Sequence, residues 1–101
     1  DMAALAALDR FAVIVTAPGE EDSDFVSRFF APAKGVPEDP VTGSAHCALG
    51  PYWQGKLGKA DLVGYQASPR GGTVLVSCHG DRVRLAGTAV TVVRGELFLP
   101  S

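Results

Sequence analysis

The sequence predicts an α+β domain in which a mainly antiparallel, strongly curved sheet wraps around one central helix. Three observations support this fold class. Segment Ser44–Leu57 has apolar residues at the spacing of an amphipathic helix. Runs of β-branched and aromatic residues precede and follow it, as expected for strands. After residue 78 the turns are short and contain glycine, which favours hairpins and therefore antiparallel pairing.

The region before the central helix contains one short helix and two strands. Met2–Leu8 is rich in alanine and leucine, which favours a helix. Phe11–Thr16 is a β-branched run that predicts a buried strand, and Phe25–Pro32 predicts a second strand ended by its proline. Between the two strands, Ala17–Asp24 is acidic and turn-rich, so we expect a solvated loop.

The predicted central helix carries its own start and stop signals. Gly58 is placed to end it, and Pro51 is expected to kink it or to end its first half. We expect its apolar stripe to pack into the core, with Tyr52 and Trp53 as aromatic anchors. The stripe comprises Ala45, Ala48, Leu49, Tyr52, Trp53 and Leu57.

The remainder of the chain predicts only strands and turns. Two strands flank a loop rich in proline and glycine, and a tight hairpin turn follows them. Arg82 and Arg84 then alternate with apolar residues, which is the pattern of a half-buried strand. The strand segments are Leu62–Ala67, Thr73–Cys78, 82–85, Ala89–Val93 and Leu97–Leu99.

Size and composition predict a single globular domain over residues 1–101, of which 47% are hydrophobic and 20% charged. The net charge is −2 and no run of Lys or Arg is present, which argues against binding to nucleic acid or to an anionic membrane surface. No apolar run approaches the roughly 20 residues that span a bilayer. Cys47 and Cys78 form no CxxC pair, so we expect a reducing, cytoplasmic setting.

One acidic residue stands out by its position. Asp39 lies between Pro37 and Pro40 and is followed at once by Thr-Gly-Ser and the predicted helix. Each proline restricts the residue before it to extended geometry, so we expect Val36 and Asp39 in a stiff, exposed loop. A rigid carboxylate above a helix N-terminus suits proton transfer on an anionic small molecule.

Four segments resemble the phenazine-biosynthesis PhzF family of isomerases. They are residues 28–32 (RFFAP), 35–46 (GVPEDPVTGSAH), 64–72 (GYQASPRGG) and 83–90 (VRLAGTAV). The resemblance implies one half of a diaminopimelate-epimerase-like fold, whose two similar halves enclose the active site between them. This chain resembles the C-terminal half only. Family members carry a catalytic glutamate and a histidine-bearing loop in the other half, and nothing here matches them.

The resemblance also implies a chemistry. The best-known members move a proton between ring carbons of a dihydro-hydroxyanthranilate without metal or organic cofactor, so we expect neither here. It makes Asp39 the catalytic residue; the alternative is a residue that only braces the loop or caps the helix. Thr42, Gly43 and Ser44 would hold the substrate carboxylate at the helix N-terminus, where the first amides lack partners. The alternative there is ordinary capping.

The other reactive side chains have simpler interpretations. His46 is a candidate for substrate binding if it faces the cleft mouth, and otherwise a packing residue. Glu38 points away from Asp39 in an extended segment and is interpreted as structural or solvated. Cys47 is interpreted as a buried, inert thiol, although related racemases use paired cysteines. The histidines lack neighbours at metal-ligand spacing, and Arg70 is interpreted as mainly structural.

Two main hypotheses follow, with a two-cysteine racemase as a weaker third. In the first, the chain is an isomerase half that acts on a small carboxylic acid and is completed by a complementary N-terminal half or by a second copy in a homodimer. In the second, it is a non-catalytic binding or dimerisation module of the same fold.

Overall fold

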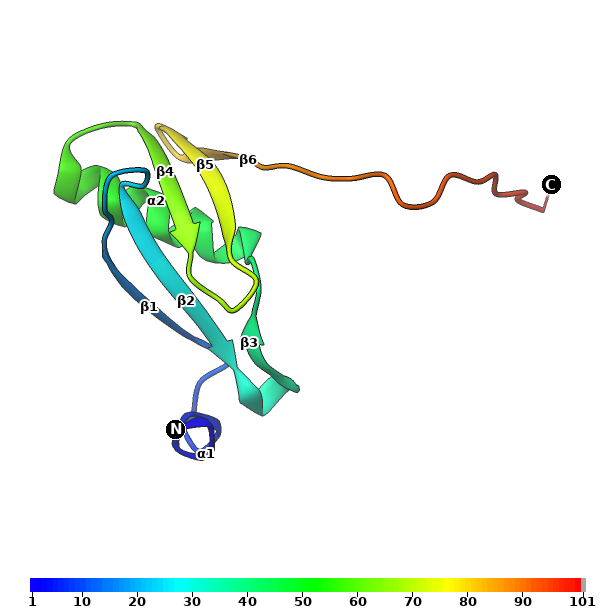
Figure 1. Ribbon diagram of the computed structural model, residues 1–101, viewed down its shortest axis with the longest axis horizontal. Coiled ribbons are helices and arrows are strands. Elements are labelled where there is room, and N and C mark those ends of the chain that lie inside the picture. The colour runs from blue at the N-terminus through cyan, green and yellow to red at the C-terminus, as the bar shows by residue number, and fades with distance from the viewer. Residues whose placement is uncertain (101) are drawn as a thin grey trace.

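The chain forms one curved sheet with a single long helix on one of its faces. The computed structural model describes residues 1–100 (Figure 1). In chain order the elements are α1 (Met2–Ala6), β1 (Val13–Pro18), β2 (Phe25–Ala31), the 3₁₀ turn η1 (Pro32–Lys34), β3 (Val36–Asp39), α2 (Gly43–Leu57), β4 (Asp61–Gln66), β5 (Gly72–His79) and β6 (Arg82–Ala86).

The strand order is β1-β2-β4-β5-β6, and β3 also pairs with β2. All pairs are antiparallel except β2 with β4, which run parallel from Phe25 opposite Gly64 to Ser27 opposite Gln66. Because β1 occupies one edge of β2 along its length, β4 and β3 share the other edge, with Phe29 opposite Asp39 in β3. The predicted α+β class with a mainly antiparallel sheet is confirmed.

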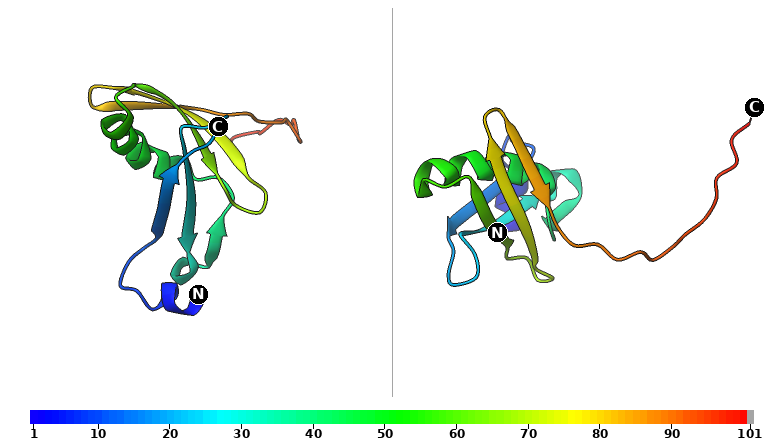
Figure 2. Two further views of the ribbon diagram at one scale, coloured as in Figure 1. Left: turned by 60° about the vertical axis from the view of Figure 1, so that its left-hand side comes forward. Right: turned by 90° about the horizontal axis from the view of Figure 1, so that it is seen from above.

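Helix α2 covers the concave side of β4, β5 and β6 (Figure 2). The ring of Phe25 from β2 stacks on Trp53 of α2, with 5.9 Å between centroids and planes 5° apart. Trp53 also donates its Nε1–H to Thr16 Oγ1 at 2.9 Å, which ties the helix to β1. The buried cluster comprises Phe25, Ala45, Leu49, Trp53, Leu62, Val74, Val76 and Cys78.

The helix matches its predicted bounds but not its predicted stripe. It runs unbroken through Pro51 and ends at Gly58, whose φ of 70° is the left-handed geometry that glycine adopts easily. Its buried residues are Ala45, His46, Leu49, Gly50 and Trp53. The helix backbone approaches the sheet closely at Gly50, where a Cβ would lie 2.7 Å from Val76 Cγ1.

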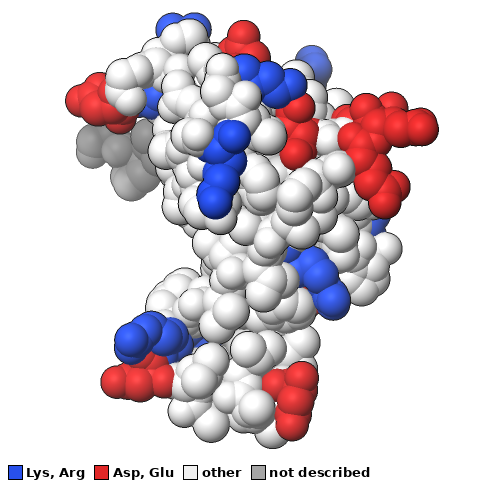
Figure 3. Space-filling model, turned by 90° about the vertical axis from the view of Figure 1, so that its left-hand side faces the viewer, with Lys and Arg blue, Asp and Glu red and all other residues white. Residues whose placement is uncertain are grey.

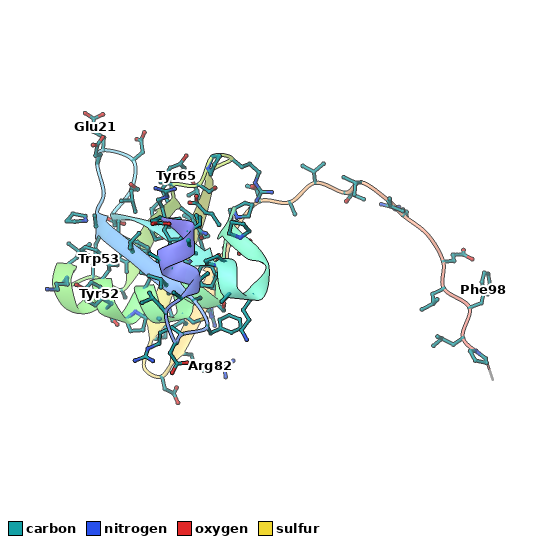
Figure 4. The ribbon with its side chains drawn as sticks, turned by 90° about the horizontal axis from the view of Figure 1, so that it is seen from below. Glu21, Tyr52, Trp53, Tyr65, Arg82 and Phe98 are labelled. Atoms are coloured by element: carbon teal, nitrogen blue, oxygen red, sulfur yellow. The ribbon has the colours of Figure 1, made fainter. Side chains whose placement is uncertain are left out.

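The predicted stripe faces the sheet only in part. Ala48 is exposed, and so are Tyr52 and Leu57, with 51% and 43% of their surface accessible. The prediction that Tyr52 lies in the core is therefore wrong, whereas that for Trp53 is confirmed. In Figure 4 the two aromatic residues lie side by side on α2, and Tyr52 packs edge-on against Trp53 at 5.2 Å.

Three other expectations need correction. Residues 36–39 form strand β3 instead of a loop, because the second half of β2 offers them an open edge. Helix α1 ends at Ala6, although Asp1 caps its start by accepting from the backbone N–H groups of Ala3 and Ala4. Segments 89–93 and 97–99 are not strands, since no strand within residues 1–100 pairs with them.

Residues 87–100 form an extended arm that leaves the domain (Figure 1). The arm raises the radius of gyration to 16.2 Å, against about 13 Å for a compact chain of this length. Its apolar side chains are between 77% and 86% exposed, and Phe98 lies near its far end (Figure 4). They are Val90, Val92, Val93, Leu97, Phe98 and Leu99. No helix within residues 1–100 has the length and apolar character needed to cross a bilayer.

Candidate functional site

The predicted acid and the helix N-terminus meet at one point of the fold. Strand β3 ends at Asp39, two residues follow, and α2 begins at Gly43 after its N-cap residue Thr42. Asp39 is half-buried and Thr42 is buried, while Gly43 and Ser44 are exposed. The structure therefore brings Asp39 next to the start of α2, with one side of that start open to solvent.

A hydrogen bond links the acid to the N-cap residue. Thr42 Oγ1 donates to Asp39 Oδ2 at 2.5 Å. The Thr42 side chain makes no capping bond to the helix, although threonine commonly does so at this position. Ordinary capping by Thr42 is thus not what the structure shows, because its hydroxyl is used on Asp39.

The central contact of the site comes from Gln66, at the end of β4, which the sequence analysis did not single out. Its side chain is fully buried. Oε1 accepts from the backbone N–H of Thr42 at 2.7 Å, and Nε2 donates to Asp39 O at 2.8 Å and to Thr42 Oγ1 at 3.0 Å. One side chain therefore fixes both ends of the segment from Asp39 to Thr42.

Ser68, two residues after Gln66, holds the same segment with a second set of hydrogen bonds. Ser68 Oγ donates to Pro40 O at 2.9 Å and accepts from the backbone N–H of Gly71 at the same distance. Along β4, Leu62, Gly64 and Gln66 are buried while their neighbours are more exposed, and Ser68 extends this alternation. Polar residues at the inward positions of a strand need hydrogen-bond partners there, and this pattern is the signal by which Gln66 and Ser68 could have been found.

His46 lies inside the domain and not at a cleft mouth. Its side chain is fully buried, and Nδ1 lies 2.7 Å from Thr42 O, so Nδ1 carries the hydrogen and donates it to the carbonyl. Its ring packs near Phe25, with 5.9 Å between centroids, and Nε2 is enclosed without a hydrogen-bond partner. His46 therefore braces the first turn of α2 from the core, which agrees with the packing interpretation and not with a position at the cleft mouth.

An open depression of about 500 Å³ lies beside the start of α2. Gly43, Val41 and Arg70 contribute to its wall, together with the start of β5 and residues 85–90. Asp39, Thr42, Ser44 and His46 are not among its lining residues. The depression therefore adjoins the exposed side of the helix start at Gly43, while Asp39 does not contribute to its wall.

Glu38 faces away from the site, as the sequence predicted. Arg28 on β2 binds it with two hydrogen bonds of 2.8 Å, from Nε to Oε2 and from Nη2 to Oε1. These bonds lower the pKa of Glu38 below its ordinary value, since they favour the charged carboxylate. This pair joins β2 to β3 and so supports the strand that carries Asp39. The interpretation of Glu38 as structural is confirmed.

The environment of Cys47 differs from the buried one that was expected. Both thiols are free, but Cys47 is exposed and Cys78 is buried. Burial raises the pKa of the Cys78 thiol, and the negative charge of Asp61 raises it further. Cys47 lies on the side of α2 that faces away from the sheet, which explains its exposure. Within residues 1–100 no three side chains of the His, Cys, Asp or Glu type are grouped for a metal ion.

On the face that Figure 3 shows, acidic side chains gather at the upper right, whereas basic side chains lie scattered between wide uncharged areas. Such a surface lacks the basic stripe that nucleic-acid binding requires.

The family model described as phenazine biosynthesis-like protein, PhzC-PhzF, matches residues 1–95. This chain belongs to the PhzC-PhzF family. Among curated relatives, an uncharacterized isomerase of Pseudomonas aeruginosa is 57% identical over 99 residues, which cover 98% of this chain and 38% of that protein. Another uncharacterized isomerase, from Halalkalibacterium halodurans, is 56% identical over 93 residues, covering 91% and 35% respectively.

A solved structure supports the same assignment at the level of the fold. The crystal structure of a PhzF-family phenazine biosynthesis protein from Enterococcus faecalis matches with a TM-score of 0.87 and 48% identity, over 98% of this chain and 38% of that one. The PhzC-PhzF chain described here thus spans little more than a third of the length of the relatives it matches.

Proposed function

We propose that this chain forms one wall of the active site of a cofactor-independent isomerase that moves a proton within a small carboxylic acid. Asp39 carries the proton, and the first N–H groups of α2 hold the substrate carboxylate, assisted by the Ser44 hydroxyl. Thr42 and Gly43 shape this site. His46 supports it from inside by holding the Thr42 carbonyl.

The observation that carries this proposal is the hydrogen bond from Thr42 to Asp39. It places a half-buried carboxylate next to the start of a 15-residue helix and keeps the N-cap hydroxyl off the helix amides. Those amides stay available to an anion, which the positive end of the helix dipole attracts. An acid beside an anion site is the arrangement that proton transfer on a carboxylate needs.

The proposed site needs a second wall to enclose the substrate. The greater length of the relatives supports the presence of such a wall. We propose that a complementary N-terminal half supplies it, with a second copy of this chain as the other possible source. The exposed arm supports the same inference, because an extended apolar segment with unpaired backbone groups is suited to join another sheet as a strand. Cytoplasmic location remains a prediction from cysteine usage.

Solvent-deuterium exchange tests this function. The chain is incubated in D₂O with a panel of small carboxylic acids, alone and with the separately expressed first half of the Pseudomonas aeruginosa relative. We expect exchange with the added half, and a loss of about 10²–10⁴-fold in the nearly isosteric variant Asp39→Asn. Asp81→Asn, in the exposed hairpin, is the matched control and should exchange like the parent. Equal rates in both variants would exclude Asp39 as the acid.

A non-catalytic binding module is the second candidate function. The exposure of Gly43 and Ser44 favours it, since an open helix terminus could bind carboxylates without the rest of an active site. Carboxylate binding by calorimetry without any exchange, even with the added half, would support this alternative. A racemase that uses thiols would instead lose activity when Cys47 is alkylated, whereas the proposed isomerase should keep its activity.

A further inference from the structure

The amide of Gln66 has only one orientation that satisfies its neighbours. The backbone N–H of Thr42 can only donate, so it must face Oε1, and the carbonyl of Asp39 can only accept, so it must face Nε2. Turning the amide over would place donor against donor and acceptor against acceptor. The two backbone partners therefore assign the two ends of this side chain without reference to hydrogen positions.

This orientation also sets the direction of the Thr42 hydroxyl. Nε2 has two hydrogens, one for Asp39 O and one for Thr42 Oγ1. Because Oγ1 accepts from Gln66, its own hydrogen is free to point to Asp39 Oδ2. The three groups form a chain in which every hydrogen bond runs the same way, from Gln66 through Thr42 to the carboxylate.

Burial protects this chain from competing water. Gln66 is fully buried and Thr42 is 8% exposed, so solvent does not offer either group a substitute partner. Asp39 is held by Oδ2, while Oδ1 receives no hydrogen bond within the part of the chain that the structure describes. Glutamate at position 66 would lack both donors, and leucine would lack every polar contact.

We propose that Gln66, acting through Thr42, is a positioning residue that orients the Asp39 carboxylate so that Oδ1 is the oxygen presented to the substrate. This inference rests on the proposed function of Asp39. It assigns the Thr42 hydroxyl to the acid and leaves the substrate carboxylate to the backbone N–H groups and Ser44.

Three variants separate positioning from simple stabilisation. Thr42→Val removes the hydroxyl at constant shape, Thr42→Ser retains it, and Gln66→Glu replaces the donor end of the amide by an acceptor. Labelled chain is studied by NMR for the side-chain rotamers of Asp39 and the exchange of the Gln66 amide hydrogens, with Gln54 as internal reference. We expect one Asp39 rotamer in the parent and in Thr42→Ser, averaging in the other two, and slower amide exchange at Gln66 than at Gln54.

The kinetic arm uses the deuterium-exchange assay with the added half. Thr42→Val and Gln66→Glu should lower kcat by about 10–100-fold and leave KM within about threefold, and Thr42→Ser should restore kcat. Equal losses in Thr42→Val and Thr42→Ser, or an unchanged Asp39 rotamer in Thr42→Val, would overturn the positioning role. If the parent exchanges nothing, the proposed function fails, and the rotamer measurement alone decides whether Gln66 orients Asp39.

Discussion

A methyl group added at Gly64 should destabilise the domain, because this glycine lies directly opposite Phe25 in the parallel pair of β4 with β2. A Cβ at Gly64 would be 2.5 Å and 2.8 Å from two atoms of the Phe25 ring and 3.2 Å from His46 Cδ2. The ring is fully buried and stacked on Trp53, so it has no free direction in which to move. Gly64→Ala therefore tests whether this contact is as tight as the structure shows.

The expected magnitude follows from the overlap. An ordinary carbon contact begins near 3.4 Å, so the ring edge would have to move by 3.4 − 2.5 = 0.9 Å. Overpacking of this kind costs about 1–3 kcal/mol. The reduced entropy of the unfolded chain offsets about 0.4–1 kcal/mol of it. From the middle of each range, about 2 kcal/mol less about 0.7 kcal/mol, we expect a net loss of roughly 1.3 kcal/mol in the free energy of unfolding, and a melting temperature lower by about 5–10 °C.

Urea denaturation of the parent, Gly64→Ala and Gly55→Ala measures this effect. Gly55 is the matched control, because it is exposed in α2 and a Cβ there would meet no atom within 4 Å. Gly55→Ala should stabilise the helix by about 0.5–1 kcal/mol, so the same chemical change should have opposite signs at the two sites. In the background of Phe25→Leu the cost of Gly64→Ala should shrink. A neutral Gly64→Ala, or strict additivity with Phe25→Leu, would refute the reasoning.

Two further predictions concern charge and thiols. A hydrogen bond from Lys59 lowers the pKa of Asp24, which also accepts from the backbone N–H of Val63 at 2.7 Å. Because the pKa is lower in the folded chain, the charged carboxylate stabilises the fold at pH values above its unfolded pKa of about 3.9. This stabilisation is lost as the pH falls below that value. Asp24→Asn should therefore flatten the loss of stability between pH 5 and 3 in acid titrations followed by circular dichroism, and an unchanged slope would contradict this. In the native chain a thiol reagent should modify exposed Cys47 quickly, whereas Cys78, whose pKa burial raises, should react only after unfolding; fast reaction of both thiols would contradict the packing of β5.

Local patterns in the sequence predicted most of the helices and strands, but they missed β3 and predicted two strands after residue 88 that are not observed within residues 1–100. The helical spacing predicted α2 to within one residue at its start, and Gly58 predicted its end because a left-handed C-terminal residue is a local requirement. The β-branched runs predicted β1 and β2 to within two residues, but the expectation that the first strand is buried is wrong, because β1 lies at the edge of the sheet and five of its six residues are exposed. Asp39 and the following Thr-Gly-Ser predicted an acid beside a helix N-terminus, since proline restricts backbone geometry over only one or two residues.

Only the tertiary structure decided which groups meet. Gln66 binds Thr42 across 24 positions of sequence, and the edge of β2 makes a strand of residues 36–39. The burial of His46 depends on Phe25 and Gly64, which come from two strands distant in sequence, and the exposure of Cys47 depends on which side of α2 packs on the sheet. Periodicity and turn chemistry arise from neighbours along the chain and can be read from it. Strand partners and the satisfaction of buried polar groups depend on contacts between distant segments, which only the folded chain brings together.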